Sequence, residues 1–325
     1  MPKLQEKAAI SANQYRKQLK EGEMAMDFQT LNNGTCFCFH GPVNIGYVLN
    51  KDNGMLIDAG IDAGTMKKVL KELEKRDLPI THLLITHAHS DHYGGAAYLQ
   101  SKHQVWTIAP ALEEAILRNP ILEPLYLFGG NDPLSELRNK FLEGEPIKVD
   151  EVISEGEWKF DELSFYAYSL PGHSYNQLGI LVDHVLFATD SYFSTEQLHK
   201  HGIPYLTDAA AAIASLHKLK GIPCDGAIPG HGEFETDFLT TIEENIRYHE
   251  HLMDWLAERV SRTSAGISHE TIIAEMCEAF QVKTPRLSQW LLYRTAVTAY
   301  LTGLLRQDRI ISSIEGYRWI FKSKS

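Results

Sequence analysis

Four side chains able to bind a metal ion lie within six residues of one another. The segment HAHSDH, residues 87–92, follows an apolar stretch that has the character of a short β-strand. His87 and His89 are two residues apart, so both can face one side as the strand ends, and a tight loop can turn Asp91 and His92 towards a second ion. Clustered imidazoles repel one another once protonated, so a purely structural role is disfavoured. The segment therefore predicts a metal site.

Three further candidate ligands come later in the chain, each after a predicted strand. His173 lies in PGHS, Asp190 ends VLFATD, and His231 lies in PGHG. Each is weak evidence alone, but the order and spacing of all three behind the first segment strengthen the case for one shared site. We interpret the other ten histidines as ordinary surface or core residues: His40, His82, His103, His184, His199, His201, His217, His249, His251 and His269.

The elements that must position these residues alternate between strands and helices, as in a layered α/β domain. We expect a hairpin from 43–50 and 54–60, helices at 63–76, 94–103 and 208–221, and strands at 81–87, 104–110, 163–173, 177–190 and 225–232. The stretch 110–150 is rich in Pro, Gly and aromatic residues. A long irregular segment of this kind is either a substrate wall or lid, or an extra helical layer.

Beyond about residue 238 the pattern changes to long amphipathic helices. We expect helices at 238–261, 268–280 and 286–305, followed by two β-type runs within 308–321. This order is typical of a winged-helix module. We therefore divide the chain into a polar segment at 1–25, a catalytic domain at 26–238 and a helical, winged-helix-like domain at 239–325.

Composition limits the possible functions. The 325 residues carry a formal charge of −11, which disfavours a general polyanion-binding surface. The four cysteines (Cys36, Cys38, Cys224 and Cys277) form no C-x-x-C pair, which favours free thiols and a reducing compartment. The N-terminal stretch has no signal-peptide core, and no apolar run approaches a membrane span. We expect a soluble cytoplasmic protein that does not enter a membrane.

The set of Asp58, His87, His89, Asp91, His92, His173, Asp190 and His231 resembles the motifs of the metallo-β-lactamase superfamily over about residues 30–235. The ligand types are most similar to those of its hydroxyacylglutathione hydrolase-like branch. The resemblance implies an αββα sandwich, in which two mixed sheets lie between outer helices.

The resemblance also implies a role for each residue. His87, His89 and His173 would hold one ion, Asp91, His92 and His231 the other, and Asp190 would bridge both. Asp58 would be a buried acid that orients the metal-binding loop. Asp91 and Asp190 are the expected catalytic carboxylates. Zinc is the default metal for such a histidine-rich hydrolase, while iron and manganese also suit these ligand types.

Two divalent ions can share a water and lower its pKa from ~15.7 towards ~7. The expected activity is thus hydrolysis of an ester, thioester or lactone of a small molecule by a metal-bridging hydroxide. β-Lactamases of this fold have Cys or Ser where Asp190 stands, which disfavours antibiotic hydrolysis. Tyr175 and Tyr192 are candidates for contacting the substrate oxygen, or else they merely pack.

Two alternatives remain. An endoribonuclease or phosphodiesterase of the same fold is supported by the tail at 262–325, which holds nine basic and five acidic residues. A ligand-binding regulator with little turnover is the other. The apolar content of the tail favours packing or a homodimer over nucleic-acid binding, because nucleic-acid affinity requires several phosphates to be neutralised together.

Overall fold

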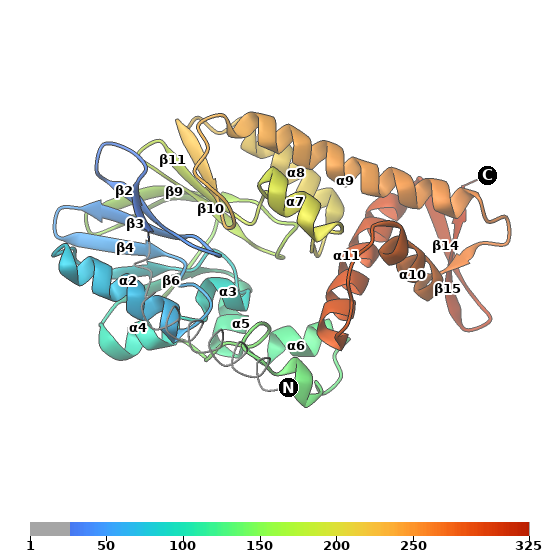
Figure 1. Cartoon of the computed structure of the whole chain (residues 1–325), viewed down its shortest axis with the longest axis horizontal. Helices are drawn as coiled ribbons and strands as arrows, with labels where there is room; N and C mark the ends of the chain where they lie inside the picture. The colour runs from blue at the N-terminus through green and yellow to red at the C-terminus, as the bar shows by residue number, and fades with distance from the viewer. Residues whose placement is uncertain (1–26, 325) are drawn as a thin grey trace, which may run out of the picture.

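The computed structural model describes residues 27–324, so the segment predicted at 1–25 lies outside the described residues. Two β-sheets stack face to face at one end of the molecule, and a mostly helical region forms the other end (Figure 1). Helix α9, Phe238–Ser261, runs from the sheets to this second region. The predicted helix at 238–261 is thus confirmed.

The first sheet has seven strands in chain order. They are β1 (Asp27–Thr30), β2 (Cys36–His40), β3 (Ile45–Asn50), β4 (Asn53–Ile57), β5 (His82–Leu84), β6 (Trp106–Pro110) and β7 (Glu151–Ile153). Strands β1 to β4 pair antiparallel, whereas β4 to β7 pair parallel. The sheet is therefore mixed, and the C-terminal ends of β4 and β5 lie side by side.

The second sheet has five strands in the order β12-β11-β10-β9-β8. They are β8 (Gly156–Phe160), β9 (Leu163–Ser169), β10 (Leu178–Val182), β11 (Val185–Thr189) and β12 (Gly226–Pro229). Only the β11–β12 pair in this sheet is parallel. The strand predicted at 177–190 is divided into β10 and β11, because the chain turns at Asp183-His184.

Three apolar clusters establish four layers. Residues such as Met55 and Ile57 from the first sheet pack against Ile180 and Phe187 from the second, so the sheets share a core. The outer face of the first sheet is covered by α2 (Ala63–Lys75) and α4 (Ala96–Lys102), and that of the second by α8 (Ala209–Leu219) and α9. This is the αββα sandwich that the resemblance implied.

The segment 110–150 contains two short helices and one 3-10 turn. They are α5 (Glu113–Arg118), α6 (Leu122–Leu127) and η1 (Ser135–Leu137). The other short helices near the strand ends are α3 (Ser90–Tyr93) and α7 (Thr195–His201). The alternative of an added helical layer thus holds for part of this segment.

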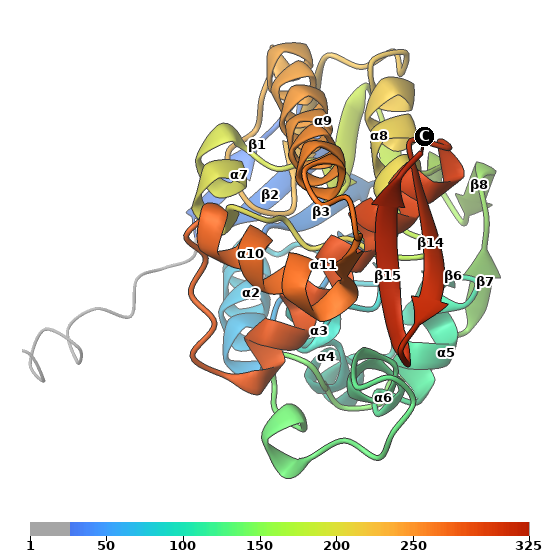
Figure 2. The same cartoon turned by 90° about the vertical axis from the view of Figure 1, so that its right-hand side faces the viewer.

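The C-terminal region contains β13 (Ile267–Ser268), α10 (His269–Ala279), α11 (Leu287–Arg306), β14 (Ile310–Glu315) and β15 (Arg318–Ser323). Strand β15 pairs with both β13 and β14, beside α10 and α11 (Figure 2). The core of the C-terminal region also contains Ile203, Leu206 and Ala209, which precede or begin α8. The tail therefore shares a core with the sandwich.

Helix α11 also packs against the segment 110–150. Leu291 is buried with Leu127 and Leu142, and a guanidinium nitrogen of Arg294 donates to the Leu127 carbonyl at 3.0 Å. These contacts bury an apolar face of the tail against another segment of the same chain. Within residues 27–324, no helix is both long and apolar enough to cross a membrane.

All four cysteines are free thiols, as expected. Cys36 and Cys38 lie in the shared core of the two sheets, where burial raises the pKa of the Cys36 thiol to about 12. A thiol held so far from ionisation is a poor nucleophile. These cysteines therefore contribute packing rather than reactivity.

His249 of α9 lies in the core of the tail, and its burial makes the stability of the protein depend on pH. Its ring is buried and lies 2.7 Å from the Tyr300 hydroxyl, and burial lowers its pKa to about 4. The pKa of His249 in the folded state lies below the ordinary value of about 6.5. The neutral, buried ring therefore contributes fully to the free energy of unfolding above pH ~6.5, and this contribution is lost as the pH falls towards ~4.

We predict that His249→Gln costs roughly 1–3 kcal/mol at neutral pH, since it disturbs a buried hydrogen bond. The cost relative to the unsubstituted protein should shrink by roughly 2 kcal/mol as the pH falls from about 7 to about 4.5. Urea denaturation at each pH measures both values. Exposed His103→Gln is the control, and a pH-independent cost would contradict the assignment.

Candidate metal centre

The candidate ligands emerge from strand ends that meet at one edge of the sandwich. Asp58 follows β4, and His87 comes three residues after β5 ends. Both Oδ atoms of Asp58 accept from the Thr86 hydroxyl at 2.9–3.0 Å, and Oδ1 also accepts from the Thr86 backbone N–H at 2.8 Å. The buried Asp58 carboxylate thus holds the start of the histidine-rich loop through Thr86.

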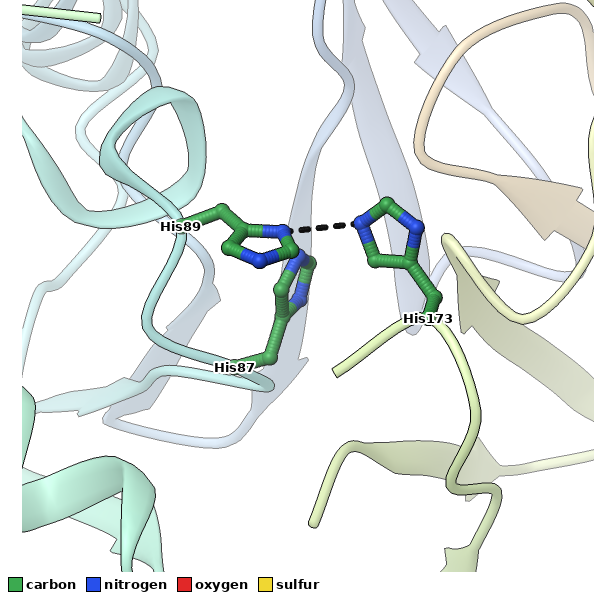
Figure 3. Close-up of side chains that lie close together, drawn as sticks. All are labelled: His87, His89 and His173. Atoms are coloured by element: carbon green, nitrogen blue, oxygen red, sulfur yellow. Dashed lines mark hydrogen bonds between the residues drawn. The ribbon is translucent and has the colours of Figure 1, made fainter. Parts of the chain in front are cut away.

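His87, His89 and His173 form the first cluster, and their rings converge from two different loops (Figure 3). His89 Nδ1 lies 2.8 Å from His173 Nε2. The ring of His87 meets that of His89 edge-on, with the centroids 4.7 Å apart. Three imidazoles at such spacing form a set able to bind one metal ion.

The second cluster comprises Asp91, His92 and His231, with His231 Nε2 at 3.5 Å from Asp91 Oδ2. Asp190 lies between the two clusters. Its Oδ2 is 3.4 Å from both His173 Nε2 and His231 Nε2, and its Oδ1 is 3.4 Å from His92 Nε2. One carboxylate thus reaches histidines of both clusters. The structure brings together all seven predicted ligands.

Four of the histidines place one ring nitrogen against a protein group outside the centre. The pairs are His87 Nδ1 with Thr86 Oγ1, His92 Nδ1 with Asp58 Oδ2, His173 Nδ1 with the Tyr205 carbonyl, and His231 Nδ1 with the Pro42 carbonyl, at 2.6–3.1 Å. Such contacts fix the orientation of each ring. The other nitrogen of each ring is left for the centre.

Unpartnered buried atoms indicate that the centre fits a cation. Among the described residues, His87 Nε2, His92 Nε2 and Asp190 Oδ1 are buried without a hydrogen-bond partner. Buried polar atoms rarely lack a partner, and each one lacking it costs free energy. Nitrogen and carboxylate oxygen atoms in this arrangement suit divalent metal ions.

The ionisation of the centre depends on burial and on its carboxylates. Burial lowers the pKa of His89 to about 4 and that of His173 to about 3, which keeps both rings neutral. Burial also lowers the pKa of His231, but the Asp190 carboxylate outweighs it and raises this pKa to about 10. Burial raises the pKa of Asp190, but His231 and His92 outweigh it and hold this pKa well below its ordinary value.

Gly230 is required next to the candidate bridging carboxylate. A Cβ atom at this position would lie 1.8 Å from Asp190 Oδ1 and 3.0 Å from the His92 ring. Both distances are shorter than van der Waals contact. Glycine thus allows the PGHG loop to bring His231 against Asp190.

A cavity of about 570 Å³ opens onto the centre. Its lining includes five of the predicted ligands, together with a larger group of apolar residues and a smaller group of polar ones. The ligands are His89, Asp91, His173, Asp190 and His231; the apolar residues include Pro42, Val43, Ile61, Phe141, Leu142, Phe193 and Leu292; the polar residues include Glu123, Gln197, Lys200, His201 and Tyr205. The wall expected from 110–150 is therefore present as well.

The prediction that Tyr175 and Tyr192 contact the substrate disagrees with their positions, because neither is among the described residues that line this cavity. Tyr192 is buried in the core under α9, and Tyr175 is 73% exposed. Tyr205 lines the cavity instead, with its ring 5.4 Å from that of His89.

Sequence reasoning missed several residues of the site. Lys200 and His201 line the cavity from α7, although His201 was interpreted as an ordinary residue. Buried Asn44 donates to the carbonyls of Pro229 and Gly232, which flank the loop of His231. The signal available for Asn44 was that it is a polar residue at a strand end. The sequence of α7 gave no signal that Lys200 and His201 line the cavity.

Two curated proteins are similar in sequence to part of this chain. A lactamase-like protein (adaB) from Aspergillus niger is 23% identical over 66% of this chain and 57% of its own length. A hydroxyacylglutathione hydrolase from Shewanella loihica is 31% identical over 41% of this chain and 42% of its own length. The chain thus spans about half the length of the curated relatives it matches.

Two solved structures share the fold over nearly the whole chain. A beta-lactamase domain protein from Burkholderia ambifaria has a TM-score of 0.71 at 17% identity, covering 93% of this chain and 95% of that one. A metallo-beta-lactamase family protein from Thermus thermophilus has a TM-score of 0.66 at 14% identity, covering 92% and 98%. The sequence model of the metallo-beta-lactamase superfamily matches residues 39–231, so the chain belongs to this superfamily.

Proposed function

We propose that the protein is a hydrolase that uses two divalent metal ions to cleave an ester, thioester or lactone of a small molecule. The observation that carries this proposal is the convergence of seven candidate ligand side chains, five of which line one cavity. His87, His89 and His173 would hold one ion, and the second cluster the other. Two such ions, when bound, lower the pKa of a shared water and polarise the bond to be cleaved.

The chain supplies positioning and charge around this chemistry. Asp190 reaches histidines of both clusters, which supports its role as the shared ligand. Asp91 also lines the cavity; burial raises its pKa, but the charge on His92 outweighs burial and holds it below its ordinary value. An ionised Asp91 can accept a hydrogen bond from the attacking water.

The donor set supports zinc as the metal, since most of its ligands are imidazoles. Iron and manganese also suit a site that includes carboxylates. The partial similarity to hydroxyacylglutathione hydrolase supports an acyl substrate. The largely apolar cavity wall favours such a small molecule over a nucleic-acid backbone, which would require several cationic contacts.

The tail is proposed to be a winged-helix-like domain at 239–325 that completes the cavity. The order α9, β13, α10, α11, β14 and β15 supports the first part, and Leu292 in the cavity wall supports the second. We keep a cytoplasmic location as part of the proposal, consistent with four free thiols. The expected homodimer stays a prediction that sedimentation of the purified protein checks.

We predict that the purified protein binds close to two metal ions, and that His89→Ala abolishes activity by disturbing the first cluster. The physical reason is the loss of one of three imidazoles that converge there. Elemental analysis and hydrolysis of a panel of esters, thioesters and lactones measure both effects. Exposed His103→Ala is the matched control. Only trace zinc, iron and manganese after reconstitution would refute the prediction.

Asp190→Ser should leave the fold intact but remove about half of the metal. Activity should fall by roughly 100-fold or more, because even groups that merely orient metal ligands contribute about 10–100-fold. Circular dichroism, metal analysis and hydrolysis rates test this together, with exposed Asp52→Ser as the control. An unchanged metal content and rate would show that Asp190 is not a ligand.

A further inference from the structure

Glu113 is a buried carboxylate close to the metal centre that lies outside the predicted ligand set. It is 1% exposed and begins α5, three residues after β6 ends. The preceding residue, Leu112, has a φ of 68° although it is not glycine. Such a backbone conformation costs roughly 1–3 kcal/mol and persists only where the surrounding structure holds it. Here it lies directly beside the inward-facing Glu113.

One oxygen of Glu113 binds the histidine-rich loop. Its Oε2 accepts from the backbone N–H of Ala88 at 2.9 Å, and Ala88 stands between His87 and His89. A hydrogen bond at this point restrains the peptide units on either side of it. Glu113 therefore acts on the backbone that carries two ligands of the first cluster.

The other oxygen binds the loop that carries the third ligand. Glu113 Oε1 accepts from the Ser174 hydroxyl at 2.5 Å and from the backbone N–H of Asn176 at 2.9 Å. Ser174 directly follows His173. The Asn176 side chain also donates to the Ala111 carbonyl at 2.8 Å, so the same loop is held twice by the segment around Glu113.

We propose that Glu113 is the positioning residue of the first metal cluster, joining the loop of His87 and His89 to the loop of His173. This inference rests on the proposed function, because it assumes that the cluster binds metal. Glu113 makes no proposed contact with metal or substrate. It acts by holding two separate loops at the spacing that three imidazoles need to share one ion.

Asp58 performs the corresponding task on the other side of the same loop. Its Oδ2 accepts from His92 Nδ1 at 2.8 Å, and His92 belongs to the second cluster. Asp58 thus contacts residues of both clusters or next to them, whereas Glu113 contacts only the backbone between His87 and His89 and the loop of His173. Removing Glu113 should therefore weaken the first cluster selectively, whereas a general loss of structure would weaken both.

Glutamine at position 113 is an informative substitution because it keeps the size and shape of the side chain. A carboxylate can accept the three hydrogen bonds described above through its two oxygens. An amide has one oxygen, and its nitrogen can only donate. Whichever way the amide turns, an N–H group would face the donors of one loop, so one of the two attachments is lost.

The experiment titrates metal-free protein with Co²⁺ and follows the visible absorbance of the bound ion. Unsubstituted protein should bind two equivalents, and His89→Ala identifies the signal of the first cluster. Glu113→Gln should weaken that equivalent by roughly 10–100-fold and leave the other unchanged. Ser174→Ala removes a single bond to Glu113, so it should weaken the same equivalent by a smaller factor.

Glu114→Gln is the matched control, since Glu114 is the neighbouring residue on α5 and its Oε2 has no hydrogen-bond partner among the described residues. Melting temperatures of the metal-free proteins separate positioning from general stability. Equal weakening of both equivalents, or wild-type affinity in both Glu113→Gln and Ser174→Ala, would overturn the inference. If the unsubstituted protein itself bound fewer than two ions, the proposed function would fail instead.

Discussion

The centre depends on the attraction between one buried carboxylate, that of Asp190, and the imidazoles that surround it. Asp190 is 4% exposed, and burying an ionised carboxylate without compensation is costly. His92, His173 and His231 each place a ring nitrogen 3.4 Å from its oxygens. The carboxylate holds His92 and His231 in their charged forms, because it raises the pKa of both. A divalent cation would replace those protons as the compensating charge.

That arrangement requires the backbone to bend sharply where the strands end. Asp58 has a φ of 65° and Thr189, directly before Asp190, has a φ of 48°. Conformations of this kind cost roughly 1–3 kcal/mol each in residues other than glycine. The parallel pairs β4–β5 and β11–β12 provide the rigid frame that keeps these bends in place. The sandwich thus supplies the free energy that holds the ligands in position.

Most of the longer helices and strands could be predicted from the spacing of their apolar residues, whereas strands such as β1, β2, β7 and β8 and the short helices α5 to α7 were not expected. The seven candidate ligands that the structure brings together could be predicted because they lie at strand ends. The residues that line the cavity could not be predicted, since they depend on contacts between distant segments. Tyr192 lies near Asp190 in sequence, but Ile242 and Ile246 of α9, some fifty residues later, cover it with apolar side chains. Glu113 likewise looked ordinary because its three donors come from two distant loops.

The tail is part of the cavity as well as of the overall architecture. Leu291 and Leu292 are neighbours on α11, yet Leu291 is buried against Leu127 and Leu142, whereas Leu292 lines the cavity. Leu142 contributes to both surfaces. Any shift of α11 relative to the segment 110–150 must therefore move one wall of the cavity, because closely packed side chains transmit displacement. The tail thus contributes to the wall of the cavity, whereas the candidate ligands lie on loops at the strand ends of the sandwich.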